Sequence, residues 1–600
     1  MKQQSLSIYT QSQRIWGHLT PYRKKQLFGL GILMILSSFA EMISLGALLP
    51  FIGIIVSPDQ IYTFAFAQIL MHMLNVSTAQ DLLLPITLIF SLTVVFAGLV
   101  RVALLWFQTQ ISLSIGADLS VAVYERTLYQ PYWSHVSRNS SEVLAAVEKA
   151  RSLVFSIIQP VIYIISALLI SIALCISLFL ININIAMTIL IGYGSIYTFL
   201  VLKSKSHISK NSKIIAFQLG SSTKVIQEGL GGIRDVIIGG LQPFFSKLYW
   251  ASLDSMHKAI SSNQIYAAAP RFGIEALTMV LVAWMGYAWS TSIGGGQNGA
   301  NLVPLLGTLI FGIQRLLPLI NQIYNASMSL KGNKHSIEDA LEQLDQITPD
   351  HSLTTSFATP ITFHHAISLK KVGFRYTNEG PWILRNFDLV IQRGSRIGLV
   401  GTSGNGKTTL LDLILGLINP TEGSIFIDGS QLSLNKIRNW QMNISHVSQA
   451  TFLSDVSVLE NIAFGESRDE IDVQRVRQAA AQVLISEVIE GLPEGYETVV
   501  GERGMRLSGG QRQLIGIARA LYKKSCVLVL DEATSSLDSD TETTVMRGIE
   551  NIGREVTIII VAHRMNTLRN CDFIVELANG NVKAIGTYQQ MFEGKILATT

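Results

Sequence analysis

The residues from Arg396 to Thr409 stand in the order that a phosphate-binding loop requires. The apolar run RIGLV (396–400) predicts a buried strand, and the segment GTSGNGKTT follows it. This segment fits G-x-x-x-x-G-K-[ST] in the strand, loop and helix context that the motif needs. Its glycines let backbone N–H groups wrap phosphates, Lys407 is expected to reach the β and γ oxygens, and Thr408 to bind Mg²⁺. The nucleotide contacts predicted here are Gly401, Ser403, Gly404, Asn405, Gly406, Lys407, Thr408 and Thr409.

A second buried-strand pattern ends in two adjacent carboxylates. The run VLVLD ends at Asp531 and is followed by Glu532. Phosphoryl transfer to water needs one carboxylate on the metal ion and a neighbouring group that orients or deprotonates the attacking water. We therefore expect Asp531 to bind Mg²⁺ and Glu532 to act on the water. The alternative is an acidic pair that merely ends a strand.

The interval between these two motifs resembles the ABC transporter family. The run LSGGQ (507–511) matches the family signature, and further family motifs occur in family order on both sides of it. Together these matches are specific, because each has its own fixed place in the order. By resemblance, the remaining site residues are Gln449 in catalysis and at Mg²⁺, His563 in catalysis, and Tyr376, Ser508, Gly510 and Asp538 in nucleotide binding.

The signature has the chemistry of a second phosphate cradle, with a Ser hydroxyl and glycine N–H groups at a helix N-terminus. In the family that the chain resembles, this cradle does not fold onto the phosphate-binding loop of its own domain. The resemblance therefore implies a head-to-tail homodimer, in which Ser508 and Gly510 of one subunit close over ATP held by Lys407 and Tyr376 of the other. ATP and Mg²⁺ are the implied cofactors.

The part of the chain before this domain has the composition of a membrane protein. The chain has 600 residues, of which 48% are hydrophobic and 15% charged, and the apolar excess lies in the first half. Such a chain is too apolar for an ordinary soluble protein. A net charge of +4 without a concentrated basic stripe predicts no nucleic-acid partner. We expect a transmembrane domain over 1–335, a linker over 336–360 and an ATPase domain over 361–600.

Long apolar segments predict six membrane-spanning helices, since each is long enough to cross a bilayer. They lie near residues 27–55, 83–108, 154–180, 185–203, 265–290 and 301–322. The expected fold class is thus an α-helical membrane domain of the ABC exporter type plus an α/β P-loop NTPase domain of the ABC ATPase type. The stretches 110–150 and 204–262 are polar with helical patterning, which favours helices prolonged into the cytoplasm over disordered loops. The segment Ile61–Val76 suggests an outer interfacial helix, with an ordinary packed helix as the alternative.

The placement of Lys and Arg predicts the orientation of these helices. Neither residue occurs in Gln26–Val100, Phe155–Leu202 or Phe272–Gln314, and each of these stretches contains one predicted outside loop. The loops between them are basic. The positive-inside rule therefore predicts a multi-pass membrane protein with both termini in the cytoplasm.

Five ionisable residues fall inside the predicted spans, and each would cost several kcal/mol if it faced lipid. They are Glu41, Arg101, Arg271, Glu275 and Arg315. The three arginines are predicted in the inner halves of their helices, where a cytoplasm-facing cavity would offer cations to a phosphate or pyrophosphate head. For Arg271 and Glu275, four residues apart on one helix, a local ion pair is the alternative.

A membrane domain followed by one ATPase domain resembles the exporter half-transporters. The membrane segments most resemble bacterial lipid-linked oligosaccharide flippases, at Phe39–Phe51, Gly229–Val236, Ala267–Glu275 and Gln314–Ile323. The resemblance implies ATP-driven movement of a lipid-linked oligosaccharide or polysaccharide precursor from the cytoplasmic to the outer leaflet. The alternatives are an exporter of another lipid, such as a lipid A precursor, of a peptide or of a drug, and an ABC protein that gates a passive pathway.

Overall fold

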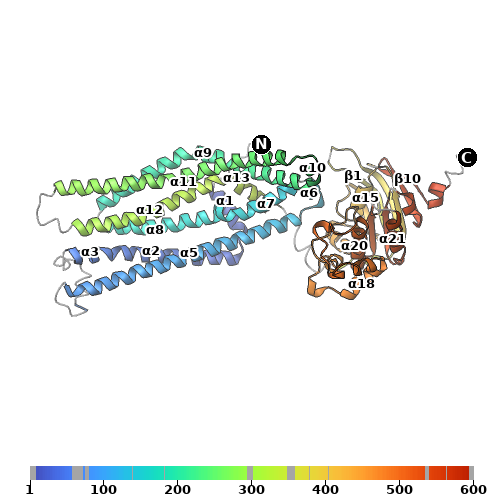
Figure 1. The fold of residues 1–600 in the computed structure, drawn as a ribbon, viewed down its shortest axis with the longest axis horizontal. Coiled ribbons are helices and arrows are strands. Elements are labelled where there is room, and N and C mark those ends of the chain that lie inside the picture. The colour runs from blue at the N-terminus through green and yellow to red at the C-terminus, as the bar shows by residue number, and fades with distance from the viewer. Residues whose placement is uncertain are drawn as a thin grey trace. The chain divides into compact units, whose positions relative to one another are not determined.

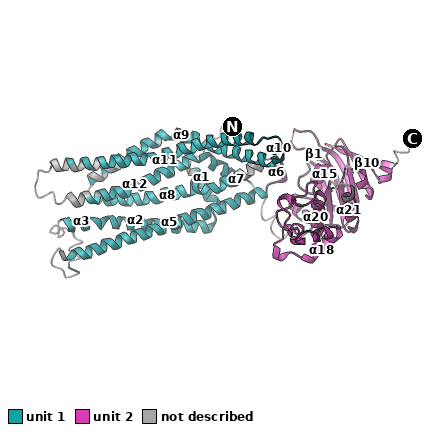
Figure 2. Ribbon diagram, in the orientation of Figure 1, with its two compact units in different colours: residues 1–130, 137–348 teal, residues 131–136, 349–600 magenta. Residues whose placement is uncertain are grey.

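The chain forms two compact units, which are coloured separately in Figure 2. Unit 1 comprises residues 1–130 and 137–348, and unit 2 comprises residues 131–136 and 349–600. Within them, this computed structural model describes residues 8–56, 72–73, 80–137, 140–181, 183–292, 302–346, 359–377, 379–402, 404–533, 539–562 and 564–593.

Unit 1 is built from helices, several of which are long (Figure 1). The long helices are α2 (Pro21–Gly46), α5 (Leu83–Leu128), α8 (Gln159–Ile181), α9 (Ile183–Gly231), α11 (Gln242–Ser292) and α12 (Leu302–Gly332). The shorter ones are α1 (Ile8–His18), α3 (Leu48–Val56), α7 (Ser140–Leu153), α10 (Ile233–Ile238) and α13 (Lys334–Leu344). A π-helical turn, Val154–Ile158, joins α7 to α8.

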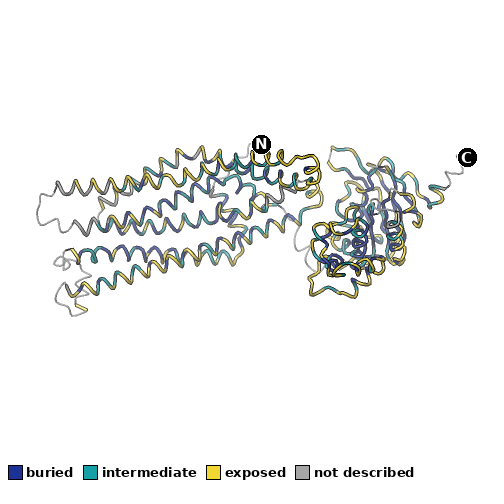
Figure 3. The backbone as a smooth tube through the Cα atoms, in the orientation of Figure 1, coloured by how far each residue is buried: buried dark blue, intermediate teal, exposed yellow. Residues whose placement is uncertain are grey.

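Apolar side chains cover the outer sides of these helices, where Figure 3 shows exposed residues in yellow. On α5, for example, Leu92, Leu99 and Val102 are 68%, 65% and 66% exposed. Such surface is stable where it meets lipid or another protein. By length and composition, three described stretches qualify as membrane spans: Pro21–Val56, Leu83–Leu128 and Val147–Ile181. The other three expected spans fall on α9, α11 and α12, whose side chains are only partly described.

Helices continue through the polar stretches that follow the second and fourth expected spans. Helix α5 runs to Leu128 and α7 begins at Ser140, while α9 runs to Gly231 and α11 begins at Gln242. The helical interpretation of both stretches is therefore confirmed. The expected interfacial helix Ile61–Val76 lies almost wholly outside the described residues.

The core of unit 2 is a six-stranded sheet with the order β10-β9-β3-β8-β7-β6. Its strands are β3 (Arg396–Val400), β6 (Ile444–Val447), β7 (Val527–Asp531), β8 (Thr557–Val561), β9 (Phe573–Ala578) and β10 (Asn581–Gly586). The pairs from β9 to β6 are parallel, and β10 adds an antiparallel edge. In a parallel sheet the carboxyl ends of the strands share one edge, so the loops after β3 and β7 lie close together.

A second sheet and several helices complete unit 2. The antiparallel sheet has the order β2-β1-β4-β5, formed by β1 (Ala366–Phe374), β2 (Leu384–Gln392), β4 (Glu422–Ile427) and β5 (Ser430–Gln431). Helix α15 (Lys407–Ile414) shares one apolar core with residues of both sheets. The other helices are α6 (Tyr132–Ser137), α16 (Ile437–Gln441), α17 (Val458–Ile462), α18 (Val473–Gln482), α19 (Ser486–Glu490), α20 (Gly509–Tyr522) and α21 (Ser539–Glu550).

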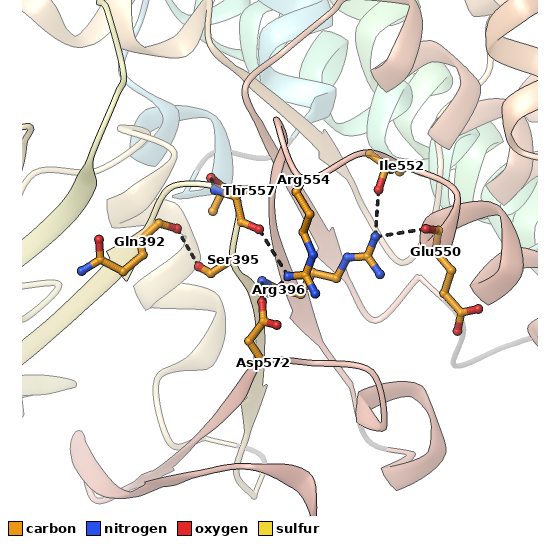
Figure 4. A network of polar contacts seen from close by, with 9 residues as sticks. Gln392, Ser395, Arg396, Glu550, Ile552, Arg554, Thr557 and Asp572 are labelled. Carbon is orange, nitrogen blue, oxygen red and sulfur yellow. Dashed lines mark hydrogen bonds and ion pairs between the residues drawn. The ribbon is translucent and has the colours of Figure 1, made fainter.

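A network of polar contacts fixes the amino end of β3 (Figure 4). The backbone N–H of Arg396 donates to Asp572 at 2.7 Å, and its Nη2 donates to the carbonyl oxygens of Glu550 and Ile552 at 3.1 and 2.8 Å. Arg554 pairs with Asp572 at 2.5 Å. Burial raises the pKa of Asp572, but the hydrogen bonds from Arg554 and Arg396 outweigh it and hold this pKa below its usual value. The strand that leads into the phosphate-binding loop is thereby anchored at its other end.

Candidate functional site

The loop between β3 and α15 curls around the ammonium group of Lys407. Its Nζ donates to the carbonyl oxygens of Gly401 at 2.6 Å and Thr402 at 3.2 Å. Gly404 and Gly406 have φ angles of 87° and 85°, which side chains disfavour. A glycine turn that ends at a helix N-terminus directs backbone N–H groups toward a bound anion. The geometry therefore suits the phosphates of a nucleotide.

Asp531, at the carboxyl end of β7, lies within electrostatic reach of Asp412 in α15. Burial and the charge of Asp531 raise the pKa of Asp412 in α15 to about 6. Burial and the charge of Glu532 raise the pKa of Asp531, while Lys407 lowers it. A divalent cation at Asp531 would relieve this repulsion. Sequence reasoning missed Asp412, although a lone acidic residue in the apolar run LLDLI was a usable signal.

Glu532 leaves β7 in a strained backbone conformation. Its φ angle is 50°, and its backbone N–H donates to the carbonyl oxygen of Val561 at 3.0 Å. A positive φ angle at a residue other than glycine costs on the order of 1 kcal/mol and occurs preferentially at functional sites.

Tyr376 lies beside α15, the helix that follows the phosphate-binding loop (P-loop), in a group of aromatic rings. Its hydroxyl and Thr409 Oγ1 are 3.1 Å apart. The ring stacks on Trp133, which also belongs to unit 2, with centroids 4.9 Å apart and an interplanar angle of 28°. Phe374 packs edge-on at 5.0 Å. Tyr376 stays 40% exposed, so an aromatic surface is available to adenine next to the phosphate-binding loop.

Ser508 caps helix α20 at the start of the signature. Its Oγ accepts the backbone N–H of Gln511 at 3.2 Å, and Gln511 Oε1 accepts the backbone N–H of Ser508 at 2.8 Å. This capping box holds the Ser508 hydroxyl and the N–H of Gly510 at a helix N-terminus, where anions bind. Within the described residues, no hydrogen bond joins Ser508 or Gly510 to the P-loop. The signature thus presents its helix N-terminus separately from the P-loop of the same chain, with donors of the kind that anions bind.

Gln513, one turn further along α20, fixes the loop that contains Gln449. Gln513 Nε2 donates to the carbonyl oxygens of Gln449 at 2.6 Å and Ser448 at 3.3 Å. Its Oε1 accepts the hydroxyl of Thr451 at 2.8 Å. The Gln513 residue is 2% exposed. Gln513 therefore ties the signature helix to the loop that contains Gln449 (448–451), which we call the Q-loop, a connection that the sequence did not reveal.

The remaining predicted site residues are partly described. Asn405 Nδ2 donates to Thr402 Oγ1 at 2.9 Å and to the carbonyl oxygen of Leu577 at 3.0 Å, which stabilises the loop. Thr408 is exposed at the start of α15, so its hydroxyl is accessible to a metal ion. The geometry of the loop fits ATP, and the acidic groups around Asp531 fit Mg²⁺. Ser403, Asp538 and His563 lie outside the described residues.

A second group of charged residues lies among the helices of unit 1. Glu41 Oε2 accepts Arg315 Nη1 at 2.8 Å, and Glu41 Oε1 accepts Arg101 Nη1 at 3.4 Å. Arg271 pairs with Glu275 on its own helix at 2.9 Å. The local ion pair considered for Arg271 is therefore present, whereas Arg101 and Arg315 converge on one carboxylate.

Comparison with known proteins covers both units. Residues 384–535 match the family described as ABC transporter, and residues 43–312 match the ABC transporter transmembrane region. The chain is 31% identical over 413 residues to the ATP-dependent lipid A-core flippase of Alkalilimnicola ehrlichii, covering 68% of each chain. It is 29% identical over 503 residues to the protein of the same name from Cupriavidus metallidurans, covering 82% of each.

A solved structure described as a bacterial Atm1-family ABC exporter with ATP bound matches with a TM-score of 0.74. The alignment covers 95% of this chain and 96% of that chain at 21% sequence identity, and so shows a shared fold. The order of the two family matches, membrane region first and ATPase second, agrees with this fold. The chain belongs to the ABC transporter family, as an exporter-type half-transporter whose ATPase domain couples ATP hydrolysis to transport.

Proposed function

We propose that this exporter is a flippase for a lipid with a phosphate-bearing head group, with a lipid-linked oligosaccharide or polysaccharide precursor as the favoured substrate. It would move the lipid from the cytoplasmic to the outer leaflet of a bacterial inner membrane, with both termini in the cytoplasm. The observation that carries the proposal is the convergence of Arg101 and Arg315 on the buried carboxylate of Glu41.

This group, which we call the Glu41 cluster (Glu41, Arg101 and Arg315), has an excess of positive charge, because two guanidinium groups share one carboxylate. The side chain of Glu41 is 6% exposed, whereas those of Arg101 and Arg315 are 48% and 28% exposed. Among the described residues, each arginine donates only through Nη1. Nε and Nη2 therefore remain for a ligand, and guanidinium groups bind phosphate through paired N–H donors.

Two similarities support a lipid substrate. The relatives from Alkalilimnicola ehrlichii and Cupriavidus metallidurans are named lipid A-core flippases. The segments that resemble lipid-linked oligosaccharide flippases include Phe39–Phe51 and Gln314–Ile323, which contain Glu41 and Arg315. A lipid A precursor is therefore the second candidate.

The proposed working form is a homodimer that binds ATP between the P-loop of one copy and the signature of the other. The capping box at Ser508 presents donors to an anion without using the P-loop of the same chain. ATP must bind the closed dimer more tightly than the open one, because a ligand shifts a conformational equilibrium only through its difference in affinity. The proposed roles are Thr408, Gln449 and Asp531 at Mg²⁺, and Glu532, Gln449 and His563 in hydrolysis.

The test is the ATPase rate of the purified protein in liposomes, for the wild type and Glu532→Gln. Each is measured with a polyprenyl-diphosphate oligosaccharide, with a lipid A-core lipid and with a neutral polyprenol. We expect the diphosphate lipid to stimulate the wild type and the variant to lose hydrolysis. Stimulation by the lipid A-core lipid alone would favour the second candidate. A rate indifferent to both phosphate-bearing lipids would refute a phosphate-lipid flippase.

A further inference from the structure

We infer that Glu41 is an internal counterion of the head-group site: it holds Arg101 and Arg315 while no substrate is bound, and an anionic head group displaces it. The inference rests on the proposed function and deepens it. The Glu41 carboxylate repels an anionic substrate. It would nevertheless keep the two arginines in place, and it would limit how tightly the substrate binds.

The contacts of Glu41 join three helices near the middle of the span Pro21–Val56. Glu41 lies on α2, Arg101 on α5 and Arg315 on α12. Charged groups inside a membrane domain are stable where they pair with one another. The carboxylate therefore brings two cations from separate helices to one point, where a single diphosphate can reach both.

The two arginines are not held equally. Arg315 Nη1 donates to Glu41 Oε2 at 2.8 Å and also to Ser44 Oγ at 3.2 Å. Arg101 makes one contact with Glu41, at 3.4 Å, and its side chain is the more exposed of the two. Arg101 is thus the partner that an incoming phosphate releases first, and Arg315 with Ser44 is the fixed part of the site.

Two unsatisfied polar groups lie on the same seam between α2 and α5. The ion pairs of Arg23 with Asp118, at 2.8 Å, and of Glu41 with Arg101 show that these helices run antiparallel. Between these two pairs lie Ser37, one turn before Glu41, and Gln108, two turns after Arg101. Both residues belong to the faces that carry the ion pairs.

Ser37 and Gln108 are 0% and 3% exposed, and Ser37 Oγ and Gln108 Nε2 have no hydrogen-bond partner in the described part of the chain. A buried polar atom without a partner costs about 1–3 kcal/mol, so such atoms usually serve a ligand or water. These two groups are left for a water molecule or a polar ligand group on this seam, one turn from Glu41 and two turns from Arg101, independently of the charges of the Glu41 cluster.

The net charge of the Glu41 cluster in a set of variants provides a test. The wild-type cluster has one excess positive charge. Arg101→Gln removes the excess, Glu41→Gln doubles it, and the double variant Glu41→Gln/Arg101→Gln restores the wild-type value. If Glu41 competes with the head group, the affinity for the anionic lipid must rise with the net positive charge of the cluster. If Glu41 only supports the fold, the double variant must bind no better than the weaker single variant.

Binding of polyprenyl diphosphate is measured on the full-length protein in phosphatidylcholine nanodiscs, with neutral polyprenol as the reference ligand. We expect Glu41→Gln to bind about tenfold more tightly than the wild type, and Arg101→Gln about tenfold more weakly. The double variant should return to within about threefold of the wild type. At saturating lipid, Glu41→Gln should also have a lower stimulated ATPase rate, because product release slows.

The matched control is Glu275→Gln, which removes the carboxylate from the Arg271 pair on α11 and should leave affinity within about twofold. Equal or weaker binding by Glu41→Gln, or failure of the double variant to recover, would overturn the counterion. If Glu41→Gln does not fold, Glu41→Asp is measured instead, because it withdraws the carboxylate by one methylene. Tighter binding of the diphosphate than in the wild type then supports the counterion, and equal or weaker binding overturns it. A wild type that binds the diphosphate no better than polyprenol refutes the proposed function instead.

Discussion

Gln513 offers the sharpest test of how the ATPase unit is held together. Its side chain makes three hydrogen bonds to the Q-loop, from a position in α20 that is 2% exposed. Gln513→Ala removes all three while leaving the helix intact, because alanine is the best helix former. We expect the loop around Gln449 to loosen and ATP hydrolysis to fall.

The loss of local stability in Gln513→Ala can be worked out from the three polar groups of the Q-loop that lose their hydrogen-bond partner. A typical hydrogen bond contributes about 0.5–1.5 kcal/mol, and a partner left buried and unsatisfied costs more. For three bonds at this site, the local opening free energy should fall by about 2–4 kcal/mol. This corresponds to an increase in local amide exchange of between about 30-fold and about 700-fold, since 1.4 kcal/mol is a factor of ten.

Hydrogen exchange of the full-length protein measures this directly. Amides in 448–452 should exchange faster in Gln513→Ala, whereas amides of β3, which belong to the central sheet, should not change. The matched control is Gln474→Ala, an exposed glutamine on α18. Exchange in 448–452 that equals the wild type, together with an unchanged ATPase rate, would show that Gln513 does not hold the Q-loop.

Substitutions at three further positions probe other parts of unit 2. Ser508→Asp keeps an N-cap acceptor on α20 but places a carboxylate where an anion should bind, so ATPase activity should fall at least about tenfold with an unchanged melting temperature. Asp572→Asn should cost about 1 kcal/mol of stability at pH 7. Because folding lowers the pKa of Asp572, the wild type loses this stabilisation when the carboxylate is protonated. The difference in melting temperature between variant and wild type should therefore be fully present above about pH 4 and vanish at lower pH. Tyr376→Phe keeps the ring and should leave nucleotide affinity within about threefold, whereas Tyr376→Ala should weaken it about tenfold in fluorescent-nucleotide titrations.

The parts of the site that depend on local patterns could be predicted from the sequence. The run RIGLV forms β3 and VLVLD forms β7, each with the bounds that its apolar pattern indicated. Both motifs combine a buried strand with a fixed set of following residues, so a few neighbouring positions determine the structure. The ion pair of Arg271 and Glu275 was foreseeable for the same reason, since four residues make one helical turn.

The contacts between distant segments could not be predicted. Glu41 is 60 residues from Arg101 and 274 residues from Arg315 in the chain. A sequence pattern shows which face of one helix is polar, but the pairing of two faces depends on how the helices pack. The same holds for Gln513 and the Q-loop, which lie 64 residues apart, and for Asp412 beside Asp531.

The separation of the Glu41 cluster along the chain has a consequence for biosynthesis. Helix α2 is synthesised before either arginine, and an acidic residue at the centre of a span costs about 2.5–3.5 kcal/mol during insertion. Arg101 follows 60 residues later and Arg315 follows 274 residues later. At about 5–20 residues per second, the second arginine is synthesised roughly 14–55 seconds after Glu41. Helices α2 and α5 must therefore associate as a pair first, and α12 completes the cluster only when most of the membrane unit has already been inserted.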